Sequence, residues 1–167
     1  MTHRAEPGTP GAPSAPGPAE PTIKVAALRD GTVIDHLPAG TALKVLSVLG
    51  IKFDGAVTIG LNFDSGKLGH KDIIKIERRE VTPQEVAKIA LISPRSSFSI
   101  IRDFQVARKF TPTLPESIEN LIHCPNPSCI SNSTWALTKF TVLRTDPLRV
   151  RCYYCERSLK KEEIELL

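Results

Sequence analysis

The sequence lacks long apolar runs, and none approaches the roughly 20 residues that a membrane-spanning helix needs. Its N-terminus also lacks the apolar segment of a secretory signal peptide. These two absences predict a soluble protein that stays in the cytoplasm and enters no membrane.

The first 22 residues lack Ile, Leu, Val and Phe altogether, although they hold six of the 14 prolines and three of the 10 glycines. Such a segment cannot bury enough apolar surface to offset the entropy of folding. Residues 1–22 are therefore expected to form a disordered tail, and the alternative is a proline-rich docking ligand. About 145 residues of ordinary composition remain, which is enough for one or two folded units.

From Thr22 onward, strand-like and helix-like patterns alternate. Apolar runs and helical spacing predict strands at 23–28, 32–37, 56–62, 72–77 and 97–106, and helices at 38–49 and 82–92. The first two runs are separated by Arg29-Asp30-Gly31, which indicates a turn or a bulge within one strand. The second helix has the clearest start, because Thr82 can act as N-cap, Pro83 suits the first turn and Glu85 completes a capping box.

The order of these elements is β-α-β-β-α-β, which is typical of a ferredoxin-like α+β domain. Two helices should cover one face of its sheet and leave the other face open. Residues 110–115 contain two prolines and should form a stiff connector to a smaller domain. We expect strands at 135–144 and 148–154 in that domain, with Trp135 in its core.

Four cysteines form the strongest chemical signal: Cys124 and Cys129 make one close pair, and Cys152 and Cys155 follow 22 residues later. Two such pairs can bring four thiolates to one tetrahedral Zn²⁺ ion. Two disulfides would need an oxidising compartment, and a redox Cys-x-x-Cys would leave the other pair unexplained. We therefore predict a small all-β, zinc-ribbon-like domain that one structural zinc ion holds together, with no open position for catalysis.

Several segments together resemble the regulatory chain of aspartate carbamoyltransferase: TVIDHLPAG at 32–40, VTIGLN at 57–62, SGKLGHKDIIKIE at 65–77, TLPESIEN at 113–120 and CPNPSCIS…CYYCE at 124–156. The resemblance runs in order over roughly residues 23–158. It implies three parts, namely the tail at 1–22, a nucleotide effector-binding domain at 23–113 and a zinc domain at 114–167.

What the resemblance implies is a non-catalytic subunit. Its first domain would bind ATP and CTP, with UTP assisting, and would pair with a second regulatory chain in a homodimer. Its zinc domain would dock on the catalytic chain, so that regulatory dimers join catalytic trimers in pyrimidine biosynthesis. Effector binding would shift the balance between tense and relaxed forms, and such coupling is typically worth about 1–3 kcal/mol.

The resemblance also implies the residues of each site. The basic positions expected at the triphosphate are Lys71, Lys75 and Lys109. Base, ribose and phosphate contacts fall on Asp35 and His36, and the apolar slot on Val25, Leu28, Val33, Ile101 and Val106. Asn126 and Glu156 match positions that reach the catalytic chain. Ala26, Ser99 and Phe104 depart from the family's acidic residue, asparagine and tyrosine, which leaves the ranking of ATP against CTP open.

Two other functions compete with this reading of the residues. A zinc-ribbon nucleic-acid binder would use the basic residues around the metal, which are Arg144, Arg149, Arg151, Arg157, Lys160 and Lys161. Four glutamates are interleaved with them, and four thiolates on one divalent ion would lower the net charge further, so we expect no nucleic-acid partner. An enzyme would need a nucleophile beside a base or an open metal site, and neither pattern is present.

Overall fold

The structure is a computed structural model that describes residues 27–50 and 54–167. Its elements are, in order, β1 (Gly31–Pro38), α1 (Ala42–Leu49), β2 (Val57–Ser65), β3 (Gly69–Glu77), α2 (Pro83–Ile92), β4 (Ser97–Arg102), β5 (Gln105–Phe110), β6 (Ser117–Glu119), β7 (Ile122–His123), η1 (Ile130–Asn132), β8 (Lys139–Thr145), β9 (Leu148–Cys152), β10 (Ser158–Lys160), η2 (Lys161–Glu163) and β11 (Glu165–Leu166). The predicted tail and residues 23–26 of the first expected strand lie outside the described residues.

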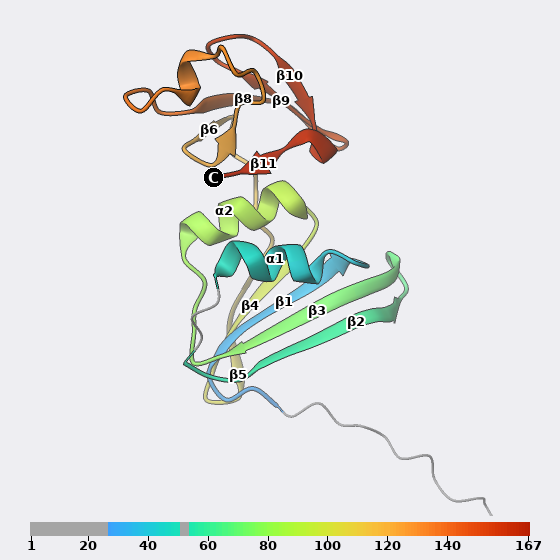
Figure 1. Ribbon diagram of the computed structural model, residues 1–167. Coiled ribbons are helices and arrows are strands. Elements are labelled where there is room, and N and C mark those ends of the chain that lie inside the picture. Colours follow the sequence, from blue (N-terminus) through green and yellow to red (C-terminus); the bar gives the residue numbers. More distant parts are fainter. Residues whose placement is uncertain (1–26, 51–53) are drawn as a thin grey trace, which may run out of the picture.

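Five antiparallel strands form the larger sheet in the order β2-β3-β1-β4-β5. The first four follow the ferredoxin-like order, so the predicted α+β fold class is confirmed. Both helices lie on one side of this sheet, between it and the smaller C-terminal strands (Figure 1). The opposite face carries no element among the described residues. In the same part of the chain, no helix has the length and apolarity needed to cross a membrane.

The strand predicted at 97–106 is wrong, because the chain turns back at Asp103 and Phe104 and forms β4 and β5. Both turn residues have positive φ values, of 46° and 61°, as a two-residue hairpin requires. Asp103 is a common turn residue, but no glycine accompanies it, so the sequence carries only a weak turn signal there. The turn is held from outside instead: Phe104 N–H donates to the carbonyl of Arg29 at 2.9 Å, and Asp103 N–H donates to the carboxylate of Asp30 at 3.0 Å.

The first helix was predicted to begin at Pro38, but that residue completes β1 and the helix begins at Ala42. The start is set by Asp72 of β3, which is fully buried. Its carboxylate accepts hydrogen bonds from the backbone N–H groups of Ala42, at 3.1 Å, and Asn62, at 2.9 Å. A partner 30 residues away leaves no trace in the local pattern. Gly50 ends the helix with φ 71°, as predicted.

The second helix follows its prediction closely. Thr82 accepts a hydrogen bond from Glu85 N–H at 3.2 Å, and the Glu85 carboxylate accepts one from Thr82 N–H at 2.8 Å. This is the predicted capping box, and Pro83 lies in the first turn. The helix ends at Ile92, before Ser93 and Pro94.

The larger region has its own core between the sheet and the two helices. Its fully or nearly buried side chains are Ile34, Leu37, Ala42, Val45, Leu49, Ile74, Ile76, Ile89, Ile92 and Phe98. Phe98 stacks on Phe110 of the neighbouring strand, with ring centroids 5.3 Å apart. This core contains no cysteine.

The C-terminal region is all-β, as expected. It has a four-stranded sheet in the order β10-β9-β8-β6 and a two-stranded pairing of β11 with β7. Trp135 was expected in its core, but its residue is 74% exposed and lies ahead of β8. Burial in this region falls instead on short aliphatic side chains, on Phe140 and on cysteines.

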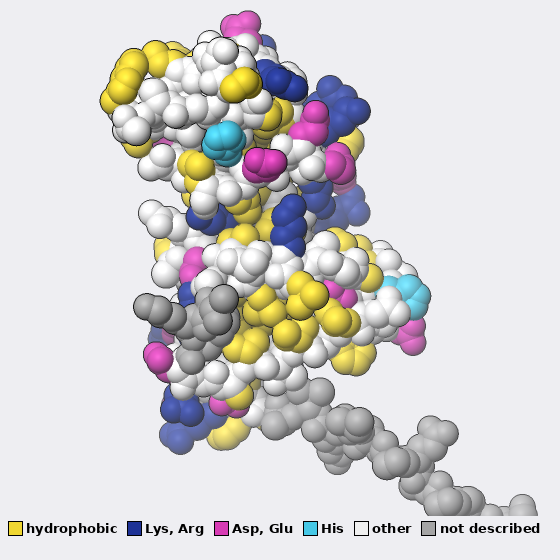
Figure 2. All heavy atoms as spheres, viewed as in Figure 1, with side chains coloured by type: hydrophobic (Ala, Val, Ile, Leu, Met, Phe, Trp, Pro, Cys, Tyr) yellow, Lys and Arg dark blue, Asp and Glu magenta, His cyan; other side chains and the backbone are white. Residues whose placement is uncertain are grey.

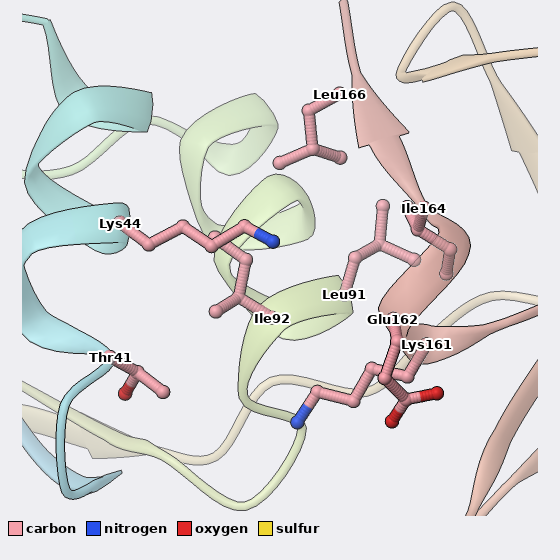
Figure 3. A pocket seen from close by; sticks show the side chains of 8 residues that line it. All are labelled: Thr41, Lys44, Leu91, Ile92, Lys161, Glu162, Ile164 and Leu166. Carbon is pink, nitrogen blue, oxygen red and sulfur yellow. The ribbon is translucent and has the colours of Figure 1, made fainter.

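The two regions touch through α2 and the C-terminal segment. Leu91 of α2 belongs to the core of the smaller region, and Leu166 of β11 packs against both cores. Lys88 Nζ donates to the Leu167 carbonyl at 2.6 Å. Between them is a cavity of about 220 Å³, into which Leu91, Ile92 and Leu166 point (Figure 3). The helices that cover the sheet therefore also form the surface against which the smaller region packs.

Candidate metal centre and the open face of the sheet

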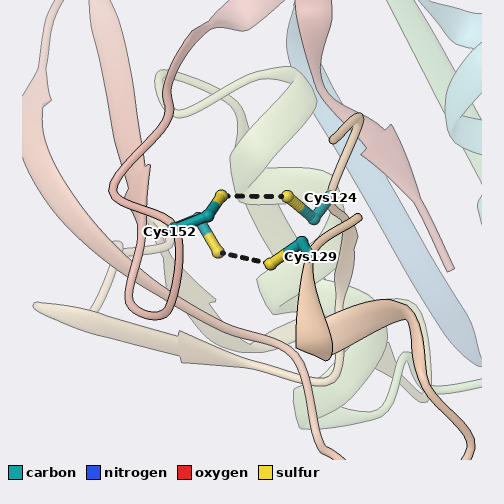
Figure 4. A group of neighbouring side chains, drawn as sticks. Cys124, Cys129 and Cys152 are labelled. Carbon is teal, nitrogen blue, oxygen red and sulfur yellow. Dashed lines mark hydrogen bonds between the residues drawn. The ribbon is translucent and has the colours of Figure 1, made fainter. Parts of the chain in front are cut away.

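The four cysteines converge from two loops of the smaller region. Cys124 and Cys129 lie between β7 and η1, while Cys152 ends β9 and Cys155 occupies the turn after it. All four sulfur atoms lie within 4.8 Å of one another. Cys124 Sγ is 3.7 Å from Cys155 Sγ, and Cys129 Sγ is 3.7 Å from Cys152 Sγ. Figure 4 shows Cys124, Cys129 and Cys152 pointing into a common centre.

These distances fit four thiolates around one metal ion. In a regular tetrahedron with metal–sulfur bonds of about 2.3 Å, neighbouring sulfurs are about 3.8 Å apart. A disulfide would bring two sulfurs to about 2.05 Å, and all four cysteines here are free. The donor set therefore fits a structural metal whose coordination is complete with protein ligands.

The pKa values of three of these thiols are shifted, and not all in the same direction. Burial raises the pKa of Cys124 to about 12, and burial also raises the pKa of Cys152. Burial acts in the same direction on Cys155, but hydrogen bonds from Arg157 N–H and the Asn126 side chain outweigh it and lower its pKa to about 6. Buried thiols of this kind become thiolates when a cation compensates their charge.

Polar residues outside the ligand set hold the first loop in shape. Asn132 Nδ2 donates to the carbonyls of Cys124 and Asn126, both at 2.9 Å. Ser131 Oγ donates to Cys129 Sγ at 3.1 Å. Sequence reasoning missed these two residues, and their closeness to Cys129 in the chain is the only signal that pointed to them.

The second group of predicted residues lies on the larger sheet. One row of register partners crosses four strands, in the order Lys75, Val33, Ser99 and Lys109. Side chains in such a row share a face, and here it is the face away from the helices. Neighbouring strands are about 4.8 Å apart, so the two lysines are separated by about 14 Å at the backbone. They can meet the two ends of an extended ligand.

Other predicted residues flank this row. Because β3 begins at Gly69, Lys71 points to the same face as Lys75. Ile101 and Val106 are register partners farther along β4 and β5. Leu28 is buried ahead of β1, and Val25 lies outside the described residues.

Asp35, His36 and Lys71 form a cluster where β1 bulges. Lys71 Nζ lies 2.9 Å from Asp35 Oδ1, and His36 N–H donates to the same oxygen at 2.7 Å. Burial acts to raise the pKa of Asp35, but the hydrogen bonds from Lys71 and His36 outweigh it and lower this pKa below its usual value. The His36 ring Nδ1 is 3.1 Å from Ser97 Oγ, which fixes the ring against β4.

A basic cavity of about 320 Å³ adjoins this cluster. It is lined by His36, Lys67, Leu68, Arg95, Ser97, Lys109 and Thr111. His36 and Lys109 were predicted site residues, whereas Lys67, Arg95 and Thr111 were missed. Those three come from a turn, a loop and the connector, and only the folded sheet brings them together.

Asn126 and Glu156, the predicted partner-contacting residues, lie beside the metal site. Asn126 is half-buried in the first cysteine loop, and Glu156 follows Cys155 with φ 59° and is exposed. Exposed apolar side chains occur in the same region: Ile130, Trp135, Leu137, Tyr153 and Tyr154. Tyr154 OH donates to the Leu137 carbonyl at 3.1 Å, which joins the loop ahead of β8 to the second cysteine turn.

Comparison with known proteins separates the same two parts of the chain. A family model described as "Aspartate carbamoyltransferase regulatory chain, allosteric domain" matches residues 23–113, which is more than half of the chain. A second, described as the metal binding domain of the same chain, matches residues 116–165. The chain belongs to the aspartate carbamoyltransferase regulatory chain family. This confirms the resemblance found in the sequence.

Individual relatives agree with the family match. The aspartate carbamoyltransferase regulatory chain of Pyrococcus horikoshii is 47% identical over 147 residues, covering 86% of this chain and 97% of the relative. That of Pyrococcus abyssi is 48% identical over 145 residues, covering 85% and 95%. That of Methanothermobacter thermautotrophicus is 44% identical over 146 residues, covering 86% and 93%.

Membership of the aspartate carbamoyltransferase regulatory chain family makes this a non-catalytic subunit of an enzyme of pyrimidine biosynthesis. The subunit has an allosteric domain and a metal-binding domain. Its partner is the catalytic chain of aspartate carbamoyltransferase. The cysteine cluster lies within the residues that the metal binding domain model matches.

Proposed function

We propose that this regulatory chain binds ATP and CTP, with UTP assisting, on the open face of its larger sheet and transmits the signal to catalytic trimers. The observation that carries the proposal is the row of register partners that ends in Lys75 on one side and Lys109 on the other. Lys109 also lines the basic cavity, so we place the triphosphate at that end. Lys75, which the resemblance puts at the triphosphate, would then lie nearer the nucleoside. Val33 lies between them as an apolar contact for the base.

The experiment is a calorimetric titration of ATP and CTP into the metal-loaded chain, with and without catalytic trimers. Lys109→Ala and Lys75→Ala should each weaken nucleotide binding, because each removes an ammonium group from the face. Lys160→Ala is the matched control, since Lys160 is an exposed lysine of the smaller region. Unchanged nucleotide affinity in both Lys109→Ala and Lys75→Ala would refute the site. An affinity that shifts when trimers are added would demonstrate the coupling.

We assign the bound metal as one zinc ion per chain. Four thiolates at tetrahedral spacing are a donor set that zinc commonly occupies in structural sites. Metal analysis of protein purified without added metal should give about one zinc per chain, the stoichiometry of a closed four-cysteine site. Iron in place of zinc would overturn the assignment. The free cysteines also suit a reducing compartment, so we place the protein in the cytoplasm.

For the regulatory homodimer, the edge strand β2 is the proposed contact. Its side chains Ile59, Leu61 and Phe63 are exposed, as is Leu43 of α1. Figure 2 shows hydrophobic side chains gathered over α1 and this edge of the sheet. An unpaired edge strand with exposed apolar side chains is a favourable site for pairing with another chain. Leu61→Lys should yield monomers in sedimentation, whereas Leu143→Lys, on an exposed leucine of the smaller region, should not.

The catalytic chain is proposed to dock on the smaller region, at 114–167, beside the metal. Asn126 and Glu156 present polar groups there, and Trp135 and Tyr153 supply exposed aromatic surface of the kind enriched at interface hot spots. Asn126→Ala and Glu156→Ala should weaken assembly with catalytic trimers while the metal content stays the same. Full assembly by both variants would move the contact elsewhere. On this division, effector binding belongs to residues 23–113.

A further inference from the structure

The loop between α2 and β4 lies between two cavities. Arg95 of this loop lines the basic cavity beside His36 and Lys109. Pro94 of the same loop lines a second cavity of about 340 Å³, together with Asp146 and neighbouring residues of the smaller region. One short loop therefore touches both the proposed phosphate end of the effector site and the β8–β9 turn.

The side chains that line the basic cavity favour the binding of an anion. Lys67, Arg95 and Lys109 contribute three cationic side chains, and His36 and Ser97 contribute polar groups. None of the described residues that line it is acidic. Asp35, the nearest carboxylate to His36, is already engaged by Lys71 and by the His36 backbone. A compact polyphosphate supplies the negative charge that such a group of side chains lacks.

Arg95 already has a partner in the other region. Its Nη2 contacts Oδ2 of Asp146, in the turn between β8 and β9. The two side chains are 70% and 62% exposed, so the pair is solvent-screened and can exchange partners. A guanidinium can bind phosphate oxygens through two parallel N–H groups, whereas its contact with Asp146 uses Nη2 alone.

We propose that Arg95 is an anion-binding residue of the basic cavity and that a polyphosphate bound there competes with Asp146 for its guanidinium. The proposal rests on the proposed function, because the anion it names is the polyphosphate of the effector. Binding at the sheet would then release the β8–β9 turn of the metal-bearing region. The coupling is reciprocal, so a contact that holds Asp146 on Arg95 must weaken polyphosphate binding by the same factor.

The test is a double-mutant cycle with the full metal-loaded chain, titrated with inorganic triphosphate and separately with ATP. Asp146→Asn should tighten triphosphate binding about two- to fivefold, because an exposed ion pair restrains Arg95 by about that factor. Arg95→Gln should weaken binding about tenfold, as loss of a charged hydrogen-bonding group does. The double variant should match Arg95→Gln alone, because Asp146 acts only through Arg95.

Two control variants separate this contact from general charge effects. Glu162→Gln removes an exposed carboxylate from the second cavity, and Arg144→Gln removes a cation there. Both should change triphosphate affinity less than twofold, as expected of exposed charges that make no direct contact. An Asp146→Asn gain that Glu162→Gln reproduces would overturn the proposal, since screening alone would explain it.

Failure of this proposal and failure of the proposed function give different results. If Lys109→Ala weakens ATP binding but neither Arg95→Gln nor Asp146→Asn changes it, the nucleotide site stands and the shared arginine is refuted. If inorganic triphosphate follows the predicted cycle but ATP and CTP do not bind, the shared arginine stands and the nucleotide assignment is refuted. A wild-type chain that binds none of these probes overturns both.

Discussion

The two regions of the chain reach a stable fold by different routes. The larger region buries an aliphatic core between a five-stranded sheet and two helices, and it needs no metal to complete that core. The smaller region has short strands, and Cys124, Cys129 and Cys152 are themselves among its buried core residues. Its centre is therefore a cluster of thiols, which become thiolates when a metal binds them. One chain thus contains a region held by apolar burial and another held by metal coordination.

Metal removal should separate the regions most strongly. Structural zinc contributes on the order of 10 kcal/mol to the folding of small domains, so chelation should unfold the smaller region and leave the larger sheet intact. The single Trp and both Tyr residues, Trp135, Tyr153 and Tyr154, all belong to the smaller region. Near-ultraviolet circular dichroism should therefore collapse, while hydrogen exchange still protects β1 and β3. An unchanged aromatic spectrum after complete chelation would contradict the comparison.

Truncation of a core side chain should instead destabilise the larger region and leave the metal site of the smaller region intact. Phe98 is fully buried and stacks on Phe110, so Phe98→Ala should lower the free energy of unfolding of the larger region by about 3–5 kcal/mol. Urea titration followed by far-ultraviolet circular dichroism measures this change, and the metal content should remain that of the wild type. Phe104→Ala is the control, because Phe104 is 63% exposed. Equal losses of unfolding free energy in both variants would contradict the assignment of Phe98 to the core.

A smaller effect is expected from the buried carboxylate that starts α1. Asp72→Ala leaves the N–H groups of Ala42 and Asn62 without their acceptor, which should cost about 1–3 kcal/mol of unfolding free energy. The control is Asp64→Ala, since the Asp64 side chain is fully exposed. Urea titration of both variants measures this loss of unfolding free energy. A stability for Asp72→Ala equal to that of the control would show that the helix start does not depend on β3.

The smallest effect concerns pH. Because the folded-state pKa of Asp35 lies below its unfolded value, its contribution is present above about pH 4 and is lost as the pH falls through the folded value. The Asp35–Lys71 pair is partly exposed, so the contribution should stay below about 1 kcal/mol. The stability difference between wild type and Asp35→Asn should shrink as the pH falls from 6 to 3. A difference that grows instead would contradict the direction of the pKa change.

Local sequence predicted those features whose determinants are close together in the chain. The capping box of Thr82 and Glu85 and the spacing of the four cysteines are of this kind, and the structure confirms the helix start and the cluster. The start of α1 depends on Asp72, and the β4–β5 turn depends on Arg29 and Asp30. Contacts between segments so far apart leave no periodic pattern.

The same distinction applies to the candidate sites. Lys109 was found through family resemblance, whereas Lys67 and Arg95 join it only because a turn and a loop fold toward β5. Trp135 was misplaced because large apolar residues are usually buried, yet this one precedes β8 in an exposed loop. The sequence therefore predicted the clustering of all four cysteines but only part of the basic cavity.

The metal ligands lie on either side of the β8–β9 hairpin, so the ion closes a ring of chain that contains the whole hairpin. The entropy of closing a ring depends only weakly on its length, with each doubling worth about 0.6 kcal/mol. Residues can therefore be gained or lost at the tip, near Asp146, with little effect on metal affinity. As far as metal binding is concerned, the hairpin tip can therefore diverge, while the coordination that folds the smaller region stays fixed.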